Sequence, residues 1–113
     1  MSRSFIGNSG SAGNATNAVI FTMPAAYNGM ISNIIAYNST GGSLNLTLTL
    51  TRAGTDFVIL ATDAVGAGAT NQYARGATKP ICPLVMLSGD VFKAQGSGSG
   101  IQVTVSGLSF GTS

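Results

Sequence analysis

The sequence predicts an all-β protein, an antiparallel β-sandwich with jelly-roll-like topology and about seven or eight short strands. Two observations carry this prediction. Apolar and polar residues alternate along most segments, and clusters of Gly, Asn, Asp and Ser separate these segments at short intervals. No window shows the sustained 3.6-residue apolar stripe of an amphipathic helix. The length, 113 residues, suits a single domain.

Three strands are predicted toward the N-terminus. The first, near residues 4–8, is weak. The second, residues 18–23, ends at Pro24, because proline has no N–H to donate to a neighbouring strand. The third, residues 30–37, is apolar on both faces, which predicts a central position in a sheet. The Asn28-Gly29 pair before it has the chemistry of a type I′ turn.

The clearest strand covers residues 44–51, where four leucines alternate with Asn and Thr. In a strand all four leucines point to one side, whereas a helix would scatter them around its circumference. Further strands are expected at residues 56–61, 81–87 and 91–95.

The last strand begins at residues 101–106, where Ile and Val alternate with Gln, Thr and Ser. The alternation breaks at Gly107, after which Leu108 and Phe110 are the apolar positions. A glycine at such a change of phase is typical of a β-bulge or of a corner where a strand changes neighbours.

The predicted domain organisation is a flexible N-terminal arm, residues 1–16, followed by one sandwich domain, residues 17–113. Residues 62–78 carry little strand or helix signal and are expected to form a long loop, which either docks on a neighbouring chain or is a mobile connection. The predicted core consists of Ile34, Leu44, Leu46, Leu48, Leu50, Phe57, Ile59, Leu84, Val103 and Val105.

The composition argues against most chemistry. Eight residues are charged, with no His and no Glu, so no catalytic residue is expected and the protein is predicted not to be an enzyme. No metal site and no cofactor are expected, because Cys82 is the single cysteine. Cys82 lies in an apolar stretch, which predicts a buried, inert thiol. The net charge of +2 is too small and scattered for a nucleic-acid partner, and no apolar run is long enough to predict a membrane partner.

A set of short motifs, in this order, resembles small tailed-phage virion proteins. Residues 19–24 and 29–38 are similar to a strand, a proline and a second strand that ends in Asn, and residues 44–51 to the Thr-rich strand that follows. Residues 87–91, Leu-Ser-Gly-Asp-Val, and residues 103–107, Val-Thr-Val-Ser-Gly, are similar to the C-terminal motifs.

The resemblance implies a non-enzymatic capsid cement or decoration protein, located on the virion and assembled in the host cytoplasm. Its implied partners are further copies of itself, with a trimer favoured, and the major capsid protein or other virion proteins. A neck or tail component, or a small carbohydrate- or receptor-binding β-module, stays open as an alternative. The scarcity of charge fits such a packed role, because uncharged polar faces are easier to desolvate than charged ones.

Four residues are expected to anchor the protein at an interface. Phe5 and Ile6 are the anchors of the N-terminal arm, which is expected to order against a neighbour and add to a sheet edge. Tyr73 and Arg75 lie in the predicted long loop and belong to the residue types enriched at interfaces.

Overall fold

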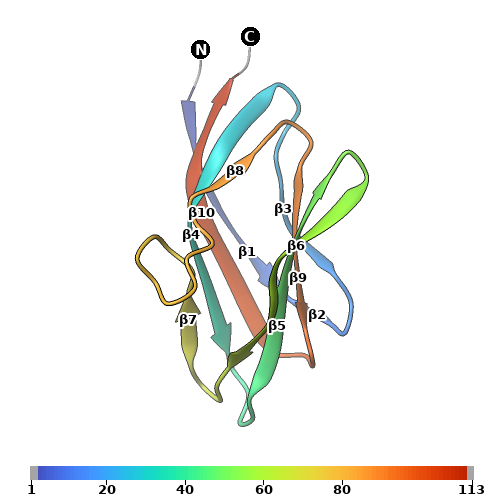
Figure 1. The fold of residues 1–113 in the computed structure, drawn as a ribbon, viewed down its shortest axis with the longest axis vertical. Helices are drawn as coiled ribbons and strands as arrows, with labels where there is room; N and C mark the ends of the chain where they lie inside the picture. The colour runs from blue at the N-terminus through green and yellow to red at the C-terminus, as the bar shows by residue number, and fades with distance from the viewer. Residues whose placement is uncertain (1–2, 112–113) are drawn as a thin grey trace.

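The computed structural model describes residues 3–111, which form ten β-strands in two facing sheets (Figure 1). The strands are β1 (Arg3–Ser11), β2 (Gly13–Asn14), β3 (Ala18–Thr22), β4 (Tyr27–Asn38), β5 (Leu44–Arg52), β6 (Thr55–Val65), β7 (Thr70–Gln72), β8 (Leu84–Met86), β9 (Val91–Gly96) and β10 (Ile101–Gly111). These residues form no helix long and apolar enough to cross a membrane.

The strand order confirms the predicted sandwich with jelly-roll-like topology. Sheet A has the order β1-β10-β4, and both β7 and β8 pair with the far side of β4. Sheet B has the order β9-β5-β6, and both β2 and β3 pair with the far side of β9. The chain passes from one sheet to the other after β1, β3, β4, β6, β8 and β9, as in a jelly roll. The strand count exceeds the prediction because one edge of each sheet is built from two short strands, β7 and β8 in sheet A and β2 and β3 in sheet B.

The core lies between the sheets and confirms most of its predicted members. Ile34, Leu46, Leu48, Leu50, Val103 and Val105 are buried, and Leu44, Ile59 and Leu84 pack against them. Phe57 is a correction, because half of its side chain is exposed. It lies on edge strand β6, near the end of the β5–β6 hairpin that extends away from the sandwich (Figure 1).

The N-terminal segment is not an arm outside the sandwich, which corrects the predicted boundary at residue 16. Strand β1 pairs antiparallel with β10 along its whole length, from Arg3 opposite Phe110 to Ser11 opposite Gln102. Ile6 points into the core and is buried. Backbone pairing with a long central strand therefore orders a segment whose side chains are mostly small and polar.

The predicted long loop is shorter in the structure. Residues 62–65 complete β6, and residues 70–72 form β7 at the edge of sheet A. The amide of Tyr73 then donates to the carbonyl of Ile34 (2.9 Å). An edge strand pairs with a single neighbour, so residues 70–73 are held by hydrogen bonds to the backbone of β4 although their sequence carries little strand pattern.

The two glycine signals have different outcomes. The register between β10 and β4 shifts between Ser106 and Gly107, which confirms the predicted irregularity. The turn expected at Asn28-Gly29 is wrong, because both residues belong to β4. The chain turns earlier, where the Tyr27 amide donates to the Pro24 carbonyl (3.2 Å).

Candidate interaction surfaces

The structure separates the four predicted interface residues. Phe5 is 94% exposed and Arg75 is exposed, so both can contact another molecule. Ile6 and Tyr73 are buried in the chain's own core, at 6% and 1% exposed, which corrects their assignment as anchors. Neighbours in the sequence point to opposite sides of a strand, which is why Phe5 and Ile6 cannot share one role.

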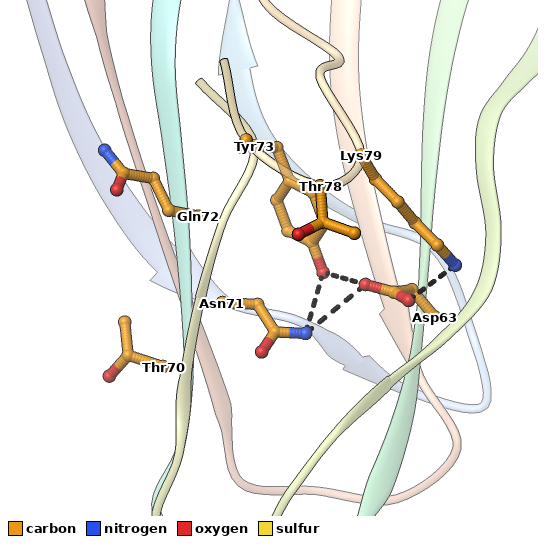
Figure 2. A pocket seen from close by; sticks show the side chains of 8 residues that line it. Asp63, Thr70, Asn71, Gln72, Tyr73, Thr78 and Lys79 are labelled. Atoms are coloured by element: carbon orange, nitrogen blue, oxygen red, sulfur yellow. Dashed lines mark hydrogen bonds and ion pairs between the residues drawn. The ribbon is translucent and has the colours of Figure 1, made fainter. Parts of the chain in front are cut away.

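Tyr73 organises a polar network beside a cavity of about 400 Å³ (Figure 2). Its hydroxyl donates to Oδ2 of Asp63 (2.7 Å), and Lys79 Nζ forms an ion pair with Oδ1 (2.7 Å). The Asn71 amide donates to Asp63 Oδ2 (3.3 Å) and to the Ala64 carbonyl (2.9 Å). Strand β6 supplies Asp63, and the segment after β7 supplies Tyr73 and Lys79, so the network ties this segment to sheet B.

The chemistry of this cavity favours a structural role. Both carboxylate oxygens of Asp63 already accept hydrogen bonds, and Lys79 occupies the position where a cation would bind. The ring of Tyr73 is buried, so it offers no face on which a sugar could stack.

The network predicts a loss of stability in acid. Burial raises the pKa of Asp63, but the hydrogen bonds from Lys79 and Tyr73 outweigh it and hold the pKa below the ordinary value of 3.8. A carboxyl whose pKa is lowered by folding stabilises the protein above its unfolded pKa, and this contribution is lost as the pH falls through the folded value. We expect Asp63→Asn to destabilise the protein by about 1–2 kcal/mol at pH 7. Urea unfolding should show this difference shrinking below about pH 4. A difference that stays constant down to pH 2 would contradict the assignment.

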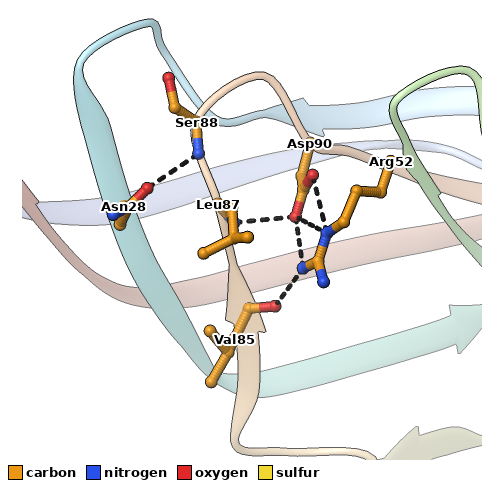
Figure 3. A network of polar contacts seen from close by, with 6 residues as sticks. All are labelled: Asn28, Arg52, Val85, Leu87, Ser88 and Asp90. Atoms are coloured by element: carbon orange, nitrogen blue, oxygen red, sulfur yellow. Dashed lines mark hydrogen bonds and ion pairs between the residues drawn. The ribbon is translucent and has the colours of Figure 1, made fainter.

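A second polar network fixes the turn between β8 and β9 (Figure 3). Arg52 at the end of β5 binds Asp90 with two nitrogens, Nε to Oδ2 (2.9 Å) and Nη2 to Oδ2 (2.6 Å). Asp90 is 2% exposed and also accepts from the Leu87 amide (2.8 Å), while Arg52 Nη2 donates to the Val85 carbonyl (3.3 Å). The hydrogen bond with Asp90 raises the pKa of Arg52 further above its ordinary value. This network holds Val85 and Leu87 in place at one edge of sheet A.

The outer face of sheet A carries a row of apolar side chains, here called the apolar row. Phe5 of β1 lies opposite Leu108 of β10, Leu108 opposite Met30 of β4, and Met30 opposite Val85 of β8. Phe5, Val85 and Met30 are 94%, 57% and 38% exposed, and Leu108 is partly buried. A contiguous exposed apolar patch on a small domain marks a binding surface.

The sequence contained a signal for the apolar row. The exchange of apolar and polar positions after Gly107 predicted a change in strand geometry. In the structure Val105 and Ser109 are both buried, so β10 keeps the same face toward the core. Leu108 and Phe110 therefore lie on the outward side of β10. The broken alternation in β10 therefore reflects apolar residues placed on the surface, while the bulge itself lies on β4, at Ser32.

The charged residues lie outside the apolar row, and nearly all of them lie outside the strands of sheet A. Apart from Arg3 at the start of β1, no strand of sheet A contains a charged residue. The remaining charges are on β5, β6, β9 and the segments that connect strands, and three ion pairs join Arg52 to Asp90, Lys79 to Asp63 and Lys93 to Asp56. Among residues 4–11 of β1 and the residues of β4, β7, β8 and β10, the outer surface of sheet A is thus apolar or polar but uncharged.

Cys82 is buried, as predicted, with 4% of its surface exposed. Burial raises the pKa of its thiol to about 11, so the reactive thiolate is scarce at neutral pH. Within residues 3–111, no group of three or more His, Cys, Asp or Glu side chains could hold a metal ion.

Comparisons with known proteins address the fold. No protein-family model and no curated protein matches the sequence. Among solved structures, the chain is similar to a subunit of Bacillus endospore appendages, described as a novel family of disulfide-linked pili. The TM-score is 0.56 with 14% sequence identity, over 99% of this chain and 88% of that chain. At this identity the likeness supports the sandwich fold alone.

Proposed function

We propose that the protein is a non-enzymatic structural protein of a virion, a capsid cement or decoration protein that packs against copies of itself and against the major capsid protein. The observation that carries this proposal is the exposed apolar row on an uncharged sheet face. Such a face gains from burial without the cost of desolvating charges. The residue motifs that resemble tailed-phage virion proteins add support, as does the use of jelly rolls in viral capsids, which is an argument by analogy of fold.

A second candidate function is that of a filament subunit, because the similar solved structure belongs to pili. Disulfide linkage of the kind named for those pili does not extend to this chain, since its single cysteine is buried in the core. A filament of this protein would depend on non-covalent contacts. A neck or tail component is compatible with the same surface. A carbohydrate-binding module is less well supported, because the Tyr73 ring beside the polar cavity is covered.

Copy number tests the proposal. In particles purified from cells that make the protein, gel densitometry is expected to show copies in the hundreds, because a cement contact repeats over a symmetric shell. About a dozen copies would instead indicate a neck or tail part, which repeats around a single axis. Absence from particles would overturn a virion role. Filaments of the purified protein in negative-stain electron microscopy would favour the second candidate.

A further inference from the structure

The two ends of the apolar row carry exposed side chains of different size. Phe5 at the β1 edge is almost wholly exposed, whereas Val85 at the β8 edge is smaller and 57% exposed. Leu108 and Met30, of similar size, lie between them. Because neighbouring strands are about 4.8 Å apart, the row spans about 14 Å.

A row with a large side chain at one end and a small one at the other is complementary to a second copy of the same row turned end to end. A two-fold axis parallel to the strands, passing midway between Leu108 and Met30, lays the row of one copy over the reversed row of another. Phe5 of each copy then faces Val85 of the other, and Leu108 faces Met30. A bulky side chain meets a small one at both ends, and two similar chains meet in the middle. The strands of the two sheets run nearly aligned, which is a common packing of stacked sheets.

Charge and area agree with pairing between identical faces. Residues 4–11 of β1 and all of β4, β7, β8 and β10 contain no charged residue, so two copies bring no like charges together there. The long strands of sheet A have 11 and 12 residues. The position beyond β4 holds only the short strands β7 and β8, so the sheet presents a face of roughly 600 Å², about three quarters of what each partner buries in a standard interface.

We propose that two copies of this chain associate through the outer faces of sheet A, with Phe5 of each copy packed against Val85 of the other. The pairing deepens the proposed structural role by naming the contact between copies. This dimer differs from the trimer that the resemblance favours. The mass of the purified protein in solution distinguishes the dimer from the trimer.

Reciprocal charge substitutions test both the surface and the arrangement. Sedimentation equilibrium of the wild type is expected to give a mass near twice the 11.3 kDa of the chain. Phe5→Asp and Val85→Lys alone should each weaken self-association at least tenfold, because each places a charge against an apolar side chain at both ends of the row. In an equimolar mixture of the two variants, association should return. In the mixed pair the introduced aspartate faces the introduced lysine at one end, and the wild-type contact remains at the other.

A matched control lies on sheet B. Val58 is 60% exposed, much like Val85, but belongs to edge strand β6. Val58→Asp should leave the mass unchanged, and circular dichroism of all variants should match the wild type. A monomer at high micromolar concentration, a mass of three chains, or a mixture that stays monomeric would overturn the pairing. A monomer that still occurs in virions in hundreds of copies would overturn the pairing alone and leave the proposed function standing.

Discussion

Gly107→Ala is expected to destabilise the protein by about 3 kcal/mol, because a buried backbone contact leaves no room for a β-carbon. A Cβ at this position would overlap the Met30 carbonyl oxygen and lie 2.9 Å from Cα of Ile31. Both atoms belong to the backbone of β4, which cannot rotate away as a side chain can. The clash lies where the register between β10 and β4 shifts, in the centre of sheet A. Relieving it requires the two longest strands of the sheet to separate.

Gly7→Ala is the matched control for this substitution. Gly7 lies on β1, opposite Ser106 and next to the same bulge, yet nothing lies within 4 Å of an added Cβ. We expect Gly7→Ala to change stability by less than about 0.5 kcal/mol. In thermal unfolding the melting temperature of Gly107→Ala should fall by roughly 10–20 °C, and that of Gly7→Ala by a few degrees at most. Equal shifts for the two variants would show that the close approach at Gly107 is relieved at little cost.

The apolar positions of the central strands could be predicted from the sequence because their alternation matches the burial. In β5 and in the first half of β10, Leu46, Leu48, Val103 and Val105 point inward as expected. Phe57 shows the limit of this reasoning. Its place in the alternation is correct for a strand. Whether it is buried, however, depends on whether the other sheet covers that part of the β5–β6 hairpin, and the local sequence pattern carries no information about this.

Segments without an apolar pattern were predicted less well. The N-terminal segment has few apolar residues and was expected to be flexible, yet its backbone pairs with β10. Its partner lies about 100 residues away in the chain, from Arg3 to Phe110. Main-chain pairing of this kind leaves little trace in side-chain composition. Gly29 was also misassigned from the sequence, because a glycine suits both a turn and a position where two strand backbones approach closely. A Cβ there would lie 2.5 Å from the Leu108 carbonyl oxygen, so its small size serves packing between strands.

The interface residues were predicted from residue type alone, and type does not determine direction. Tyr73 was assigned to an interface because tyrosine is common in interfaces, but its hydroxyl has an internal partner in Asp63. Met30 and Val85 are ordinary residues in a strand, and the change of phase that involves Leu108 indicates a bulge rather than an interface. They form one surface only after the register of four strands brings them side by side.

Asp90→Ala is expected to destabilise the protein by about 3 kcal/mol, because the substitution removes one partner of a buried, charge-assisted network. Asp90 is 2% exposed, and its loss leaves the Leu87 amide without its acceptor and the Arg52 guanidinium without its carboxylate. Arg52 is 39% exposed and regains water, which keeps the cost below that of a fully buried pair.

Asp56→Ala provides the comparison for Asp90→Ala. Asp56 is 52% exposed and its ion pair with Lys93 is longer, at 3.8 Å, so we expect a loss of less than about 1 kcal/mol. Urea unfolding at low and at high salt separates the two cases. Salt screens an exposed pair, whereas the bonds of Asp90 are short and covered, so the difference between Asp90→Ala and the wild type should persist in 1 M NaCl. A difference that vanishes at high salt would show that Asp90 acts as a surface charge. Because Asp90 and Arg52 also hold the backbone of Val85 and Leu87, Asp90→Ala should weaken self-association more than Asp56→Ala does, even under conditions where both variants are fully folded.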